Sequence, residues 1–80
     1  MRLHYYQFPD NVPKEDLELY GCDSPGDVIS GVSVTFAKKM LRQYGGVAWT
    51  EHIERDGGCF EVTEITLKGN NSRFRYNHHL

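Results

Sequence analysis

The residues best equipped for chemistry lie near the C-terminal end, where cations and aromatic rings alternate over residues 73–76. Arginine next to exposed aromatic rings is typical of single-strand nucleic-acid platforms and of protein-interface hot spots. A last strand with Phe74 and Tyr76 buried and both arginines in solvent explains the same alternation, and we favour it for the rings. Arg73, Arg75 and Tyr76 are the first candidate binding residues.

A second basic set is predicted on a helix, because Lys38, Lys39 and Arg42 fall opposite its apolar stripe. This basic helix face could meet phosphates or an acidic partner surface, although such faces are usually only solvated. Lys38, Lys39 and Arg42 are therefore candidate binding residues as well. Together with Arg73 and Arg75 they would support only weak, salt-sensitive binding to nucleic acid.

Two cysteines and four histidines raise the question of a zinc site. Structural zinc sites draw on paired ligands two to four residues apart, such as C-x-x-C. Only the adjacent His78 and His79 come close to that spacing, and adjacent residues rarely point at one metal. We expect no metal and no cofactor. Cys22 and Cys59, which show no dense spacing pattern, fit a reduced cytoplasm better than a disulfide.

Glu51, His52 and Glu61 form the one trio that resembles catalytic residues. If His52 faces Glu61 across a hairpin, the carboxylate could orient the imidazole, as it does in general-base sites. No motif places a nucleophile beside them, although Thr50 and Cys59 are near. A cross-strand polar pair on a solvated sheet face explains the pattern better, so the chain is not expected to be an enzyme.

The elements that position these residues follow from turn signals and hydrophobic periodicity. Asp56-Gly57 between two β-rich runs is a strong hairpin signal, Ser33 is a helix N-cap candidate, and Gly45 can end that helix. The predicted order is a strand over residues 2–8, a short helical turn over 14–20, a loop over 21–31, a helix over 33–44, a hairpin over 47–67, a turn over 69–71 and a last strand over 72–77.

Charge selects the register of the hairpin. A turn at Asp56-Gly57 pairs Ile53 with Phe60 and His52 with Glu61, whereas a turn one residue later would face glutamates with glutamates. Like charges directly opposite each other are destabilising, so the first register is predicted.

In this register, simple alternation would put some apolar residues of the second hairpin strand on one face of the sheet and the others on the opposite face. A β-bulge near Thr63 would return them to one face with Trp49 and Ile53, and we predict that Trp49 packs under Met40 or Leu41 of the helix. Glu51 shares the parity of Trp49, so it either enters the core or marks the edge of an apolar face.

Size and composition limit the classes of protein. The chain has 80 residues, 39% of them hydrophobic and 25% charged, which is ordinary for one globular domain. Its net charge is −2, whereas a domain that coats phosphate is normally basic. The N-terminal thirty residues are acidic and could mimic phosphate, although charge for solubility explains them better. The start of the chain lacks the apolar run of a signal peptide, and no membrane span is expected.

The sequence thus predicts a single α+β domain over residues 1–80, an antiparallel β-meander of about four strands with one amphipathic helix on one face, in the order β-(loop)-α-β-β-β. The predicted function is that of a cytoplasmic, non-catalytic binding module that docks on another protein through polar edges. Its small size is associated with phage or mobile-element proteins that inhibit host machinery. The alternative is a small nucleic-acid-binding protein that uses the basic helix face and the arginine-bearing last strand.

Overall fold

The structure is a computed structural model that describes residues 2–53, 59–68 and 73–77, with side chains for residues 2–53 and 61–68. The elements in chain order are β1 (Arg2–Gln7), α1 (Lys14–Leu19), β2 (Val28–Ser30), α2 (Val34–Tyr44), β3 (Val47–Ile53), β4 (Cys59–Ile65) and β5 (Arg73–Asn77). The predicted α+β class is confirmed. Within the described part of the chain, no helix is long and apolar enough to cross a membrane.

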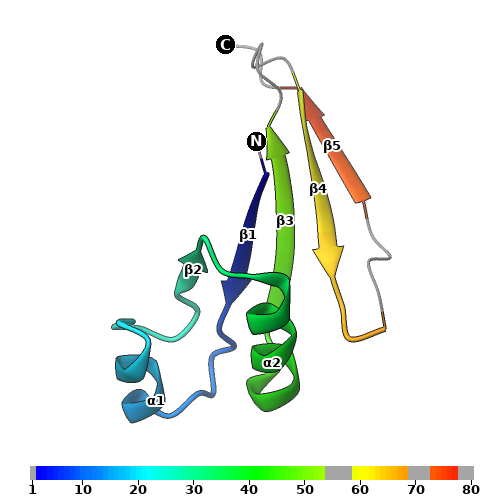
Figure 1. Cartoon of the computed structure of the whole chain (residues 1–80). Coiled ribbons are helices and arrows are strands. Elements are labelled where there is room, and N and C mark those ends of the chain that lie inside the picture. The colour runs from blue at the N-terminus through cyan, green and yellow to red at the C-terminus, as the bar shows by residue number, and fades with distance from the viewer. Residues whose placement is uncertain (1, 54–58, 69–72, 78–80) are drawn as a thin grey trace.

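All five strands pair antiparallel in one sheet with the order β2-β1-β3-β4-β5. Figure 1 shows α2 lying across one face of this sheet and both helices gathered at its lower end, so that the upper half extends beyond them. Strand β2 was not predicted. It pairs Val28–Ser30 with Tyr5–Gln7, and three residues are too short to show an alternation pattern of their own.

Helix α2 begins and ends where its sequence predicts. The side chain of Ser33 accepts a hydrogen bond from the Phe36 backbone N–H at 3.0 Å, and Gly45 follows the last turn with φ of 83°. Ala37 and Met40, on the predicted apolar stripe, are fully buried.

The core lies between the lower half of the sheet and the two helices. Its centre is one row across three strands, Tyr6 of β1, Ala48 of β3 and Ile65 of β4, all at most 1% exposed. Met40 covers this row from α2, and Leu17 adds the one buried side chain of α1. The full buried set is Tyr6, Phe8, Val12, Leu17, Cys22, Ala37, Met40, Ala48 and Ile65.

Two tyrosine hydroxyls tie the elements together. Tyr6 Oη donates to the Gly45 carbonyl at 2.7 Å, and Tyr44 Oη donates to Asp16 Oδ2 at 2.8 Å, joining α2 to α1. Burial raises the pKa of Tyr6 to about 12, and the hydrogen bond to Asp16 raises the pKa of Tyr44 to about 12. Both phenols are therefore held in the neutral, donating form.

The hairpin register is confirmed, but the predicted bulge is wrong. Ile53 pairs with Phe60 and His52 with Glu61, and the pairing continues without interruption to Ala48 and Ile65. The predicted turns at residues 56–57 and 69–71 lie outside the described residues, whereas the predicted last strand is present and pairs with β4.

Without a bulge, Trp49 cannot lie under α2. Ala48 is the β3 residue that is fully buried beneath the helix, and neighbouring strand residues point to opposite faces. Trp49 therefore lies on the other face, where its ring stacks on Tyr5 with centroids 5.3 Å apart and planes 11° from parallel. A small alanine at the contact with Met40 leaves room for the helix to approach the sheet, which the largest side chain in the chain would not.

Candidate functional site

The sheet face opposite α2 carries a half-buried aromatic and aliphatic surface, which we call the open face. Tyr5 and Trp49 form its centre, and neither belongs to the cluster that packs beneath the helices. Gln7 pairs with both Val28 and Val47, which are 47% and 44% exposed and extend this surface toward the lower end. The residues of the open face with described side chains are Leu3, Tyr5, Gln7, Val28, Ser30, Val47, Trp49, Glu51, Ile53, Val62 and Glu64.

Glu51 fixes the two central rings. The indole Nε1 of Trp49 donates to Glu51 Oε2 at 3.0 Å. The pKa of Tyr5 is raised, first by burial and then by the Glu51 carboxylate. Glu51 therefore lies among the rings of a half-buried face and does not enter the core. The stack and the hydrogen bond together hold the Trp49 ring in one orientation.

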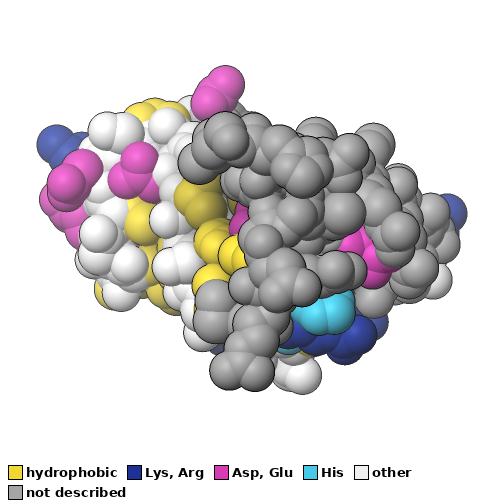
Figure 2. All heavy atoms as spheres, turned by 90° about the horizontal axis from the view of Figure 1, so that it is seen from above, with side chains coloured by type: hydrophobic (Ala, Val, Ile, Leu, Met, Phe, Trp, Pro, Cys, Tyr) yellow, Lys and Arg dark blue, Asp and Glu magenta, His cyan; other side chains and the backbone are white. Residues whose placement is uncertain are grey.

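The opposite face, above the start of α2, holds a polar pocket of about 220 Å³. Its floor consists of two rows across β1, β3 and β4, and one side is the first residue of α2. Figure 2, a view from above, shows histidine side chains next to Lys or Arg side chains at this end of the molecule. The lining residues are Arg2, His4, Val34, Thr50, His52, Glu61 and Thr63.

One contact in this polar pocket has the form of a nucleophile beside a base. His4 Nδ1 and Thr50 Oγ1 are 2.8 Å apart. A catalytic pair of this type also needs a third group that orients the imidazole. Among the described side chains, none makes a second hydrogen bond to His4, so the described residues do not supply that third group. The described residues likewise contain no group of three or more His, Cys, Asp or Glu that could hold a metal ion.

The predicted basic residues lie on two separate elements. On α2, Lys38 is half-buried while Lys39 and Arg42 are exposed. Arg73 and Arg75 lie on the edge strand β5, where they pair with Thr63 and Glu61 of the polar pocket. Tyr76 pairs with Phe60. Helix α2 packs on β1, β3 and β4, so its packing does not join the two basic sets into one surface.

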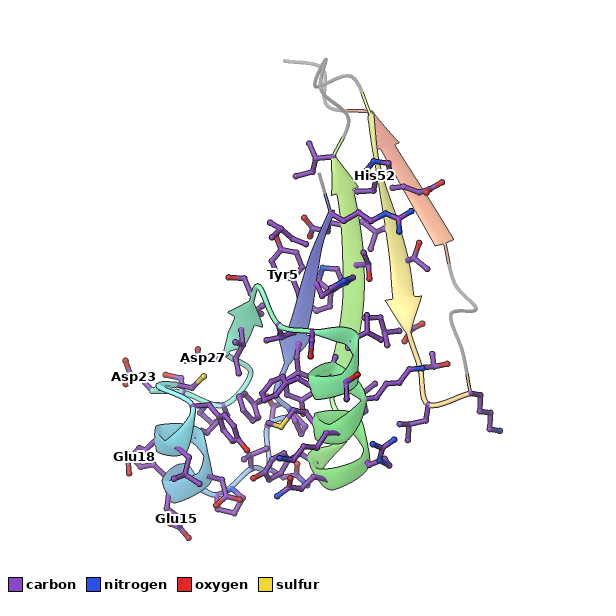
Figure 3. All side chains as sticks on the ribbon, in the orientation of Figure 1. Tyr5, Glu15, Glu18, Asp23, Asp27 and His52 are labelled. Atoms are coloured by element: carbon purple, nitrogen blue, oxygen red, sulfur yellow. The ribbon has the colours of Figure 1, made fainter. Side chains whose placement is uncertain are left out.

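A group of acidic residues from the N-terminal part of the chain lies at the opposite end of the molecule from the polar pocket (Figure 3). Figure 3 shows Glu15, Glu18, Asp23 and Asp27 on α1 and the loop after it, with His52 far along the sheet. Part of this charge has a structural role, because Asp27 Oδ2 accepts the backbone N–H groups of Asp23 and Ser24 at 3.0 and 3.3 Å.

Cys22 is a free, buried thiol in the same region. Its pKa is raised first by burial and then by Asp27 and Asp23, so the thiol stays protonated and unreactive.

Sequence reasoning missed both surfaces for identifiable reasons. The open face was missed because Trp49 was assumed to be buried under the helix. Simple alternation along the strand from the predicted His52–Glu61 pair would have placed Trp49 on the opposite face. The polar pocket depends on the pairing of β1 with β3, which brings Arg2 and His4 beside residues nearly fifty positions later. No local pattern signals that pairing. Comparison of the chain with protein-family models, with curated proteins and with solved structures finds no match in any of the three.

Proposed function

We propose that this protein is a non-catalytic binding module that docks on another protein through the open face. The observation that carries this proposal is the Tyr5–Trp49 stack, held by Glu51 on a face that neither helix covers. Large aromatic rings with a polar tip are enriched at protein interfaces, because they bury much area at little cost in side-chain entropy.

The charge on the open face favours a protein over a nucleic acid. Its charged residues among those described are Glu51 and Glu64, and no lysine or arginine lies on its described part. A platform for single-stranded nucleic acid combines stacking rings with cations that meet the phosphates. Carboxylates beside rings instead suit a partner whose surface is apolar at its centre and basic around it.

Rigidity adds to the case. The rings project from paired strands, and the indole has one stacking partner and one hydrogen-bond partner. Side chains that are already ordered lose little entropy when a partner covers them, which leaves more of the contact energy as affinity. Strand β5 is the edge of this sheet, and Tyr76, which pairs with Phe60, stays a predicted contributor to the interface. Arg73 and Arg75 stand opposite Thr63 and Glu61 of the polar pocket, so they stay predicted binding residues outside the open face.

Affinity capture with three variants tests the proposal. Trp49→Ala removes the central ring, and Glu51→Lys with Glu64→Lys reverses the charge of the open face. The control, Glu15→Lys with Glu18→Lys, makes the same charge change on exposed positions of α1. We expect both open-face variants to lose the protein that the parent captures from nuclease-treated lysate, and the control to retain it. Equal capture by all four proteins would show that the interface lies elsewhere.

The second candidate is weak nucleic-acid binding through α2. It is favoured by Lys39 and Arg42, which are exposed on the side of α2 away from the sheet. The association with phage or mobile-element inhibitors, and a cytoplasmic location, stay predictions from the sequence.

A further inference from the structure

The polar pocket lies where the apolar core stops. Moving up the sheet from the buried row of Tyr6, the next row on the same face is His4, Thr50 and Thr63, and the row after it is Arg2, His52 and Glu61. Six polar side chains therefore line a hollow that α2 only borders, through Val34. Residues packed for stability alone would continue the apolar row or project into open solvent.

The His4–Thr50 pair presents a hydrogen-bond donor in every state. If Thr50 donates to Nδ1, the proton of His4 is on Nε2, which then donates. If Nδ1 donates to Thr50 Oγ1, the threonine hydroxyl can donate its own proton to a ligand. In either arrangement a ligand facing this pair can therefore accept a hydrogen bond from it.

The charges around the polar pocket also favour a ligand that accepts hydrogen bonds. Arg2 contributes a guanidinium with several donors in a fork, and it makes no ion pair with any residue that the structure describes. The pocket also borders the first turn of α2, where the helix dipole is positive. Glu61, the one acid among the described lining residues, stands opposite Arg75 in the register and has an interaction of its own.

We propose that the polar pocket binds a small oxyanion of phosphate size, either free phosphate or the phosphate group of a small monoester. A volume of about 220 Å³ is below the ~300–1,000 Å³ of pockets for drug-sized ligands, but it accommodates one tetrahedral anion. Arg2 and the His4–Thr50 pair donate to its oxygens, with Thr63 beside them. This site is on the opposite face from the proposed protein interface and does not depend on it.

The test is a titration of the ¹⁵N-labelled protein with inorganic phosphate and, separately, with glycerol 2-phosphate, at fixed ionic strength. We expect saturable shifts of the amides of His4, Thr50 and Thr63. Arg2→Gln should weaken binding at least tenfold and Thr63→Val severalfold. Glu61→Gln should tighten binding, because it removes the carboxylate that repels an anion. Lys39→Gln, which removes an exposed charge from α2, is the matched control and should change nothing.

The outcomes separate this site from its alternatives. Saturation by one ligand only would identify the source of the anion and support the proposal. Shifts that do not saturate, or an equal loss in Lys39→Gln and Arg2→Gln, would mean general attraction to surface charge and would overturn it. Weaker binding in Glu61→Gln would also overturn it, since the carboxylate would then be holding a cationic group. The folded state of each variant is checked by its thermal unfolding.

Discussion

Trp49→Ala should separate stability from binding, because its ring lies on the open face and not in the core. Replacing a fully buried large aromatic residue by alanine costs about 3–5 kcal/mol. Trp49 is only half-buried, and its replacement by alanine removes one ring stack, with Tyr5, and one hydrogen bond, to Glu51. We therefore expect the free energy of unfolding to fall by about 1–2 kcal/mol. Met40→Ala, at a position with no exposure, should cost about 2–5 kcal/mol.

Urea denaturation of the parent and both variants, followed by circular dichroism, measures these losses. The same Trp49→Ala variant should lower partner affinity by about 2–4 kcal/mol, roughly 30- to 700-fold in Kd, if the ring is a hot spot. Trp49 is the single tryptophan of the chain, so acrylamide quenching of the parent reports its exposure directly. A loss of stability equal to that of Met40→Ala, with a ring inaccessible to acrylamide, would refute the placement of Trp49 on the open face.

Three further outcomes follow from the geometry. The pKa of Tyr6 is about 12 in the folded protein against 10.0 in the unfolded chain. The neutral phenol therefore contributes about 2–3 kcal/mol to the free energy of unfolding below pH 10, and this contribution is lost as the pH rises toward 12. Denaturation at several pH values should show a smaller loss of stability in Tyr6→Phe than in the parent. Gly46→Ala should unfold at clearly lower temperature, because its Cβ would clash with the Gln7 carbonyl and φ there is +87°. Any retardation of short oligonucleotides in a gel should weaken with salt and disappear in Lys38→Glu with Arg42→Glu; retardation that survives the double change would exclude α2 as the nucleic-acid surface.

Local signals predicted the local parts of this fold. The cap at Ser33, the glycine after α2 and the pairing of His52 with Glu61 each depend on residues close in sequence or on one turn. Neighbouring charges and turn chemistry are sufficient there, and the structure agrees with all three. The prediction failed where it used residue size as a proxy for burial. Placing Trp49 in the core required a β-bulge, and the uninterrupted pairing of β3 with β4 shows that this bulge is absent.

The non-local parts had no signal of this kind. Strand β2 has three residues and is held by its pairing with β1, and β1 in turn pairs with β3 across the whole of α1, β2 and α2. The positions of Arg2 beside His52 and of His4 beside Thr50 follow from that pairing alone. Within a short window of sequence, Arg2 and His4 are two polar residues in an aromatic strand, and nothing in that window indicates which face of the sheet they occupy or which strand pairs with them.

The alternation of β1 and β3 gives the sheet two faces with opposite chemistry. Odd positions place Tyr5, Trp49 and Glu51 on the open face, while even positions place His4 and Thr50 at the polar pocket. The open face is apolar and acidic, which suits a basic protein surface, whereas the polar pocket offers donors to an anion. Because the two faces share strands but not side chains, substitutions on one should leave the other intact. A variant such as Trp49→Ala that abolished phosphate binding as well would show that the strands, and not the side chains, had moved.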